Sequence, residues 1–143
     1  PATLASQSKI EASYKESALT AINDGLVPAD EHDRSMGFYN WTPKKNSTEW
    51  IMYEFPEATK VSSTTVYWYD DAPWGGCRVP KSWCVYYKDS KGQWIPVNAT
   101  GTYGTEKGKG NTVEFNPIQT QALKLEVVLP DDYSSGVFEW EIE

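Results

Sequence analysis

The chain has 143 residues, a length typical of one domain with a hydrophobic core of its own. Its 13 Lys and Arg residues stand against 20 Asp and Glu residues, a formal net charge of −7 that argues against nucleic acids and anionic membrane surfaces as partners. The single histidine, His32, leaves little material for a histidine metal site or a Ser-His-Asp relay. No apolar stretch reaches the about eighteen residues of a membrane span, so the sequence predicts a soluble domain.

The first third of the chain has weak patterns. Residues 1–8 are small and polar and are expected to form a tether, and residues 10–14 are expected to form a first short strand. Residues 17–23 have helix-compatible spacing but are too short for a stable helix, so a turn or two is expected. Gly and Pro interrupt residues 24–45, which predicts a loop long enough to be functional or to bind a ligand.

Seven further strands are predicted from their β-branched and aromatic residues or from alternating polarity. They span residues 49–55, 61–69, 82–88, 94–97, 112–115, 122–129 and 137–142, with a turn at residues 89–92. In the sixth of them, one face carries only apolar side chains, as in a half-buried antiparallel strand: Leu123, Leu125, Val127 and Leu129. About eight strands with almost no helix predict an all-β, eight-stranded sandwich of Greek-key or jelly-roll type.

The connection at residues 70–80, DDAPWGGCRVP, carries the main binding signal. Trp74 lies between a proline and two glycines, where a strand-core position is difficult, and an indole on a loop suits the CH face of a sugar ring. Asp70, Asp71 and Arg78 would then supply hydrogen bonds to sugar hydroxyls. The alternative is structural: Trp74 folds over the edge of the sandwich and Arg78 pairs with one of the aspartates.

Two other loops contain candidate ligand groups. Residues 21–35 are rich in carboxylates and suit Ca²⁺, but they lack EF-hand spacing, so a solvated acidic loop is the alternative. Residues 130–136, PDDYSSG, place Tyr133 between charged and small residues, and Tyr103 lies on the turn at residues 101–104. Each tyrosine is a candidate ligand contact or a partly packed side chain.

Neither a disulfide nor catalysis follows from the sequence. Cys77 and Cys84 flank a passage from turn to strand, where either a disulfide or two separate thiols is compatible with the pattern.

Glycoside hydrolysis needs two carboxylates about 5–10 Å apart across a cleft, whereas Asp70 and Asp71 are sequence neighbours. A small glycosidase, with Asp71 or Glu139 as the essential carboxylate, is the least favoured function.

Several stretches resemble a known family. GGCRVPKSWCVYYK at residues 75–88, followed by DSKGQW, is similar to the discoidin domain found at the C-terminus of coagulation factors V and VIII, and AINDG and FEWEI near the two ends resemble further motifs of that family. The family shares its fold with carbohydrate-binding module family 32, so the resemblance implies a galactose-binding-domain-like jelly roll over residues 9–143. DGLVP, TEWIMYEF and VYWYDD are also similar to C-terminal modules of bacterial enzymes such as β-L-arabinofuranosidases and chitobiases.

The resemblance implies one structural Ca²⁺. Its ligands map to the side chains of Asp24 and Glu139 and to three backbone carbonyls, those of Ala21, Leu26 and Phe138. The family has a Ser or Thr ligand five residues after the aspartate, where this chain has Ala29. Asp30 or Ser35 would have to replace it, or the site is empty.

The resemblance also implies a shallow sugar site on the loops. The family's loop arginine maps to Arg78, its aromatic platform maps best to Tyr133, and His32 is the one histidine that could take the place of a family histidine. Trp74 has no fixed family equivalent and is included on the loop argument alone.

These observations predict a non-catalytic, lectin-like carbohydrate-binding module. We expect a monomer that binds a galactoside, arabinoside or N-acetylhexosamine, outside the cytoplasm: secreted, periplasmic or at the cell surface. The chain begins at Pro1 without a signal-like segment, so it is expected to be part of a longer protein with an upstream catalytic domain. The alternative is a structural domain that packs on its neighbour and buries Trp74 and Tyr133 there.

Overall fold

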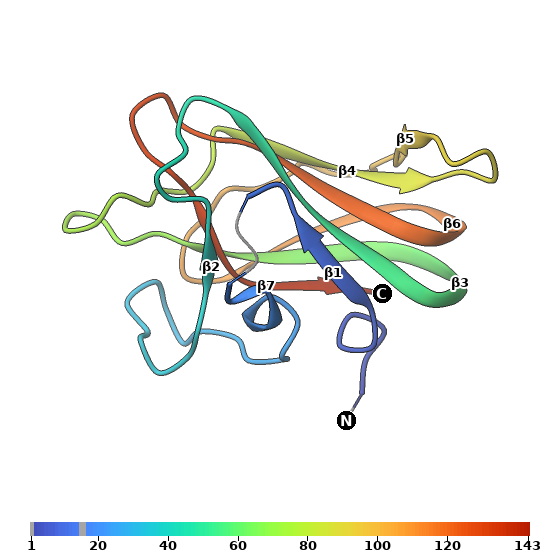
Figure 1. The fold of residues 1–143 in the computed structure, drawn as a ribbon, viewed down its shortest axis with the longest axis horizontal. Helices are drawn as coiled ribbons and strands as arrows, with labels where there is room; N and C mark the ends of the chain where they lie inside the picture. Colours follow the sequence, from blue (N-terminus) through green and yellow to red (C-terminus); the bar gives the residue numbers. More distant parts are fainter. Residues whose placement is uncertain (1, 15–16) are drawn as a thin grey trace.

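The structure is a computed structural model that describes residues 2–14 and 17–143, and it consists mainly of antiparallel β-strands (Figure 1). One short 3₁₀ turn, η1 (Leu19–Ala21), lies where the sequence predicts a turn or two. The strands are β1 (Lys9–Ala12), β2 (Tyr39–Asn40), β3 (Thr48–Tyr69), β4 (Ser82–Lys88), β5 (Trp94–Pro96), β6 (Gly110–Val128) and β7 (Gly136–Ile142).

The long strands β3 and β6 pair with each other and bend together. Their register changes between Glu54 and Thr59 of β3, and Pro56 lies within this irregular stretch. A proline has no N–H for the ladder, so a break in regular pairing is expected there. Figure 1 shows both strands turning back at the right-hand end, so each strand contributes one half to each of two stacked layers.

The remaining strands complete the two layers. In one layer, β1 pairs with the first half of β3, β4 pairs with the second half of β6, and β5 pairs with β4. In the other, β7 pairs with the second half of β3, and β2 pairs with β7. The fold is therefore the predicted all-β jelly-roll sandwich, but with two differences: the predicted strand pairs 49–55 with 61–69 and 112–115 with 122–129 are each one bent strand, and β2 was not predicted.

The core lies between the layers because alternate residues of each strand point inward. Tyr53 of β3 stacks on Trp140 of β7 with 4.1 Å between ring centroids, and Trp68 of β3 meets Trp83 of β4 edge to face at 5.5 Å. Both pairs bridge the two layers. The largest fully buried side chains are Trp41, Trp68, Trp140, Tyr39, Tyr53, Phe55, Phe138, Ile22, Ile51, Leu123, Leu125 and Leu129.

The N-terminal segment, for which the sequence predicts a tether, folds against the domain. Ala5 is buried among the core residues, and Asn23 donates a hydrogen bond from its side-chain amide to the Ala5 carbonyl at 2.8 Å.

Cys77 and Cys84 do not form a disulfide. Across residues 2–14 and 17–143, no helix has the length and apolar character needed to cross a membrane.

Candidate functional site

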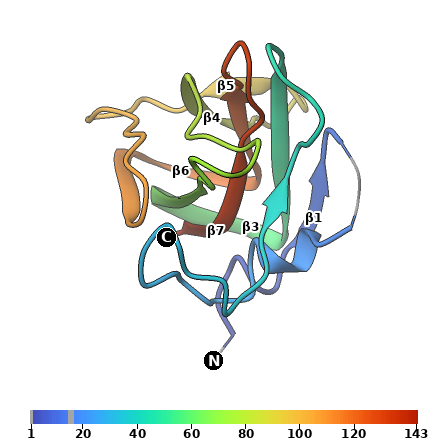
Figure 2. The same ribbon diagram turned by 90° about the vertical axis from the view of Figure 1, so that its left-hand side faces the viewer.

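Four loops meet at one end of the sandwich and form what we call the rim (Figure 2). They comprise residues 22–38 between η1 and β2, 70–81 between β3 and β4, 97–109 between β5 and β6, and 129–135 between β6 and β7. Contacts join them: Lys107 lies 3.9 Å from Asp70, and the His32 ring lies 6.4 Å from that of Trp74. The exposed large apolar side chains that the structure describes lie on these loops: Leu26, Val27, Trp74 and Tyr133.

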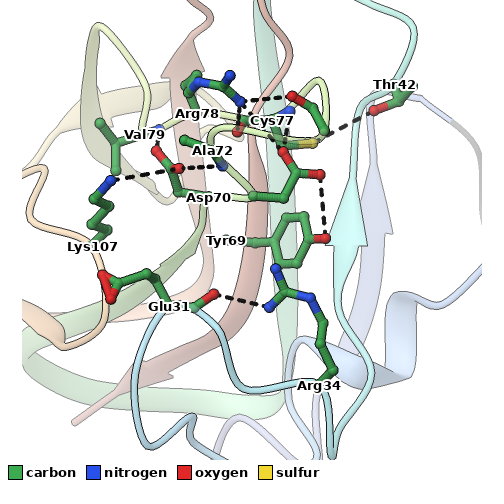
Figure 3. Close-up of polar contacts among 12 residues, drawn as sticks. Glu31, Arg34, Thr42, Tyr69, Asp70, Ala72, Cys77, Arg78, Val79 and Lys107 are labelled. Atoms are coloured by element: carbon green, nitrogen blue, oxygen red, sulfur yellow. Dashed lines mark hydrogen bonds and ion pairs between the residues drawn. The ribbon is translucent and has the colours of Figure 1, made fainter.

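Asp70 holds the two ends of the 70–81 loop together (Figure 3). Its Oδ1 accepts a hydrogen bond from the Ala72 N–H and its Oδ2 accepts one from the Val79 N–H, each at 3.0 Å. The side chain is buried, with the ammonium of Lys107 3.9 Å away. Since both carboxylate oxygens serve the loop, the predicted role of Asp70 as a sugar ligand does not fit its position.

Asp71 turns into the same loop. Its Oδ1 accepts from the Cys77 N–H at 2.8 Å and lies 3.5 Å from Arg78 Nη1, and its Oδ2 accepts from the Tyr69 hydroxyl at 3.4 Å. The structural alternative, in which Arg78 pairs with an aspartate, therefore describes Asp71 and Arg78 correctly.

Arg78 also contacts Tyr133, which lies on the loop at residues 129–135 of the rim. Its Nη1 donates to the carbonyls of Gly75 and Cys77 at 2.8 Å each, and its guanidinium carbon lies 4.1 Å from the centroid of the Tyr133 ring. A guanidinium in this position gains a cation–π interaction. All of these hydrogen bonds use Nη1, so the N–H groups of Nε and Nη2 have no hydrogen-bond partner within the described part of the chain and remain for a ligand.

Trp74 is the most exposed large apolar side chain on the rim, with 84% of its surface accessible. It does not fold over the edge of the sandwich; the His32 ring lies near it in a T-shaped arrangement, at 6.4 Å and 65°. The sequence predicts both residues as candidates from separate loops, and the structure brings them together. Tyr133 has 41% of its surface accessible. Four side chains therefore lie on the rim, either exposed to solvent or at the edge of the rim: Trp74, His32, Arg78 and Tyr133.

Tyr103 does not belong to this group. Its ring packs on Trp83 at 4.7 Å, and its hydroxyl accepts a hydrogen bond from the Val85 N–H at 3.3 Å. Burial raises its pKa above the usual value for tyrosine. Tyr103 is a structural residue at the margin of the core, which corrects its prediction as a sugar contact.

A second cluster under the rim contains residues that the sequence does not mark. Phe38 stacks on Tyr69 at 3.7 Å, and the guanidinium of Arg34 lies 4.9 Å from the Tyr69 ring centroid. Burial and the charge of Asp71 raise the pKa of Tyr69 above its usual value. Arg34 also donates to the carbonyls of Glu31 and Asp33, so it ties the 22–38 loop to the end of β3 (Figure 3). Loop residues have no periodicity from which such a contact could be predicted.

The residues implied for calcium lie on the side of the domain next to η1. Trp140 N–H donates to the Ile22 carbonyl at 2.8 Å, which places the 21–26 segment, including Ala21 and Leu26, along the β7 residues that follow Phe138. Glu139 is buried; its Oε2 accepts from the Gly25 N–H at 3.0 Å, while its Oε1 has no hydrogen-bond partner among the described residues. Burial raises the pKa of Glu139 to about 9, and the neighbouring Asp24 carboxylate adds to the rise.

A cavity of about 250 Å³ lies at Glu139, lined by Ala5, Gly25, Glu139 and Glu141 among others. The lining is more apolar than polar, and the feature that suits a hard cation such as Ca²⁺ is the buried Glu139 oxygen without a hydrogen-bond partner among the described residues. Asp30 and Ser35, the two substitutes considered for the missing ligand, are engaged elsewhere: Asp30 Oδ1 accepts from the His32 N–H, and the Ser35 hydroxyl donates to Asp33 at 2.6 Å. That hydrogen bond, with those from the N–H groups of Ala29 and Ser35, lowers the pKa of Asp33 to about 2.

Solved structures with the same fold cover nearly the whole chain. The chain matches a structure of the Streptococcus pneumoniae beta-galactosidase BgaA with a TM-score of 0.77 and 17% identity, covering 93% of this chain and 89% of that one. It matches chitosan-binding module 1 of a chitosanase/glucanase from Paenibacillus sp. IK-5 with a TM-score of 0.69 and 16% identity over 100% and 99% of the two chains. It also matches CpGH89CBM32-5 of Clostridium perfringens, solved with GalNAc-β-1,3-galactose, with a TM-score of 0.69 and 13% identity over 97% and 96%.

At these identities the structures establish the shared fold, and the family follows from the sequence profile. The family model for the F5/8 type C domain matches residues 3–141, which is nearly the whole chain. The chain therefore belongs to the F5/8 type C domain family.

Proposed function

We propose that this domain is a non-catalytic carbohydrate-binding module that holds its glycan at the rim. The observation that carries the proposal is Trp74: a large indole, 84% accessible, on a loop that two aspartates fix internally. An apolar surface of this size on a rigid loop favours a ligand with an apolar face, and the CH face of a pyranose or furanose ring is such a partner.

The neighbouring polar groups suit sugar hydroxyls. Arg78 has N–H donors at Nε and Nη2, and the imidazole of His32 lies at the edge of Trp74. Hydrogen bonds from these groups would fix the orientation of a ring that stacks on Trp74. A shallow site of this kind buries little surface, so we expect dissociation constants on the order of 0.1–1 mM.

The similar structures support a ligand class. One was solved with GalNAc-β-1,3-galactose and another is a chitosan-binding module, so galactosides and hexosamines are the first ligands to test, with arabinosides beside them. Several matched chains come from glycoside hydrolases. We therefore place this domain beside a catalytic domain of the same protein, which it would hold near a glycan by raising the effective concentration.

Calorimetric or NMR titration of the domain with galactosides, arabinosides and N-acetylhexosamines tests the proposal. We expect saturable binding to at least one class and no hydrolysis of aryl glycosides by the isolated domain. A correctly folded domain that binds none of these sugars at 10-fold above the expected dissociation constant, about 10 mM, would refute the proposal.

We also propose that the domain binds one structural Ca²⁺ at Glu139. The side chains of Asp24 and Glu139 would hold the ion together with the carbonyls of Ala21, Leu26 and Phe138. The unpaired Oε1 of Glu139 and the adjoining cavity support the site. A bound cation would keep the carboxylates of Asp24 and Glu139 ionised and would fix the 21–26 segment against β7.

Calcium is expected to raise the melting temperature relative to EDTA, because a metal that binds only the folded chain stabilises it by mass action. At a hundredfold excess over the dissociation constant, the gain is about 2.7 kcal/mol, or about 8 °C for a domain of this size. Differential scanning calorimetry measures it. Glu139→Gln should abolish the response, whereas Glu57→Gln, at an exposed residue of β3 outside that cavity, should retain it. Identical transitions in calcium and EDTA would remove the metal from the proposal.

A further inference from the structure

We propose that Asp71 is a positioning residue that fixes the place of Trp74 and does not itself contact the sugar. The inference rests on the proposed function of the rim, because it concerns the residue that presents the stacking platform. It changes the role that the sequence predicts for Asp71, from hydrogen bonding to sugar hydroxyls to shaping the loop beneath them.

The backbone of Asp71 closes the loop that carries Trp74. Its carbonyl accepts hydrogen bonds from the N–H groups of Trp74 and Gly75, each at 3.0 Å, and its own N–H donates to the Cys77 carbonyl at 3.1 Å. The peptide groups on both sides of Trp74 are therefore tied to one residue. The position of the indole depends on the conformation that Asp71 adopts.

The carboxylate of Asp71 fixes that conformation through three donors. They are the Cys77 N–H at 2.8 Å, the Tyr69 hydroxyl at 3.4 Å and Arg78 Nη1 at 3.5 Å. The side chain is four-fifths buried, with 20% of its surface accessible. Its two oxygens are therefore engaged by the loop and its supports, whereas Nε and Nη2 of Arg78 remain available for a ligand.

Gly75 shows how closely the loop is packed on this carboxylate. A Cβ atom at residue 75 would lie 1.9 Å from Asp71 Oδ2 and 2.6 Å from Oδ1, much closer than atoms can approach. A side chain at residue 75 would have to displace the carboxylate or the backbone next to Trp74. The Asp71 carboxylate leaves no room for a side chain at residue 75, so a glycine is required there. This gives the proposal a specific test.

A double-mutant cycle between Asp71 and Gly75 is the test. Gly75→Ala and Asp71→Ala should each weaken sugar binding at least tenfold, because each moves Trp74. In the Asp71→Ala background the carboxylate that Gly75→Ala would strike is gone, so the second substitution should change the affinity less than twofold. Additive losses in the double variant would overturn the steric part of the proposal.

Two further measurements separate positioning from direct contact. Asp71→Ala should weaken binding of every deoxy analogue of the best sugar by the same factor; a loss that disappears for one deoxy sugar would show a direct hydrogen bond and overturn the proposal. In ¹⁵N NMR spectra without sugar, Asp71→Ala should shift the Trp74 indole N–H and speed hydrogen exchange at the Cys77 amide, and Asp71→Asn should partly restore both. Unchanged spectra would overturn the proposal even if no sugar binds, so its failure is distinct from failure of the proposed function.

Discussion

Replacing Trp74 with alanine is expected to weaken sugar binding at least tenfold while leaving the melting temperature unchanged. The indole is the most exposed large apolar side chain on the rim. Truncation of such an aromatic anchor costs at least about 1.4–2 kcal/mol, a tenfold or greater loss of affinity. Because Trp74 is 84% accessible, its removal takes little from the folded state. Calorimetric titration and thermal melting of the same samples measure the two effects.

Trp94→Ala is the matched control. Trp94 is a half-buried indole on β5, at the opposite end of the sandwich from the rim (Figure 1), so its removal should leave the affinity unchanged. Equal affinity of Trp74→Ala and the unaltered domain would place the sugar elsewhere.

If the unaltered domain binds no sugar, an exposed Trp74 fits the alternative of a contact with a neighbouring domain. Reduced acrylamide quenching of Trp74 in the longer protein would then be expected.

The sandwich could be predicted from the sequence because alternation of polarity is a local signal. Leu123, Leu125 and Val127 are buried as the period of two requires. The joining of the predicted strands into β3 and β6 could not be predicted in this way. Whether a chain resumes its pairing after a bend depends on its partner strand. The pairing of β3 with β6 breaks after Glu54 and resumes at Thr59, because β6 bends with β3.

The rim was predictable in part. Proline and glycine on either side of Trp74 disfavour a strand, so a loop position for the indole followed from local chemistry, whereas its exposure is shown by the structure. The roles of the acidic residues did not follow, because a carboxylate on a loop can accept hydrogen bonds from backbone N–H groups as readily as from a ligand. Asp70 does so, and only tertiary structure shows that its two donors are Ala72 and Val79. The packing of Tyr103 could not be predicted for a related reason: Trp83, from strand β4, covers this turn residue, which glycines flank in the sequence.

Replacing Trp140 with alanine is expected to produce the largest loss of stability among these variants, about 3–5 kcal/mol, or a fall of about 9–15 °C in melting temperature. The side chain is fully buried between the layers and stacks on Tyr53 at 4.1 Å. Its Nε1 donates to Thr64 Oγ1 at 2.6 Å, so truncation leaves both a cavity and a buried hydroxyl with one hydrogen bond fewer. Chemical denaturation monitored by far-UV circular dichroism measures the change.

Trp140→Phe distinguishes the contributions of the ring and of its N–H group. Phenylalanine can retain the stacking on Tyr53 but not the hydrogen bond to Thr64, so a loss of about 1–2 kcal/mol is expected. Trp94→Ala, which removes an indole from the surface of β5, should cost at most about 1 kcal/mol. Equal destabilisation by Trp94→Ala and Trp140→Ala would contradict the placement of Trp140 between the layers. Since Trp140 also bonds through its backbone N–H to Ile22, the same packing that holds the layers together fixes the segment beside Glu139.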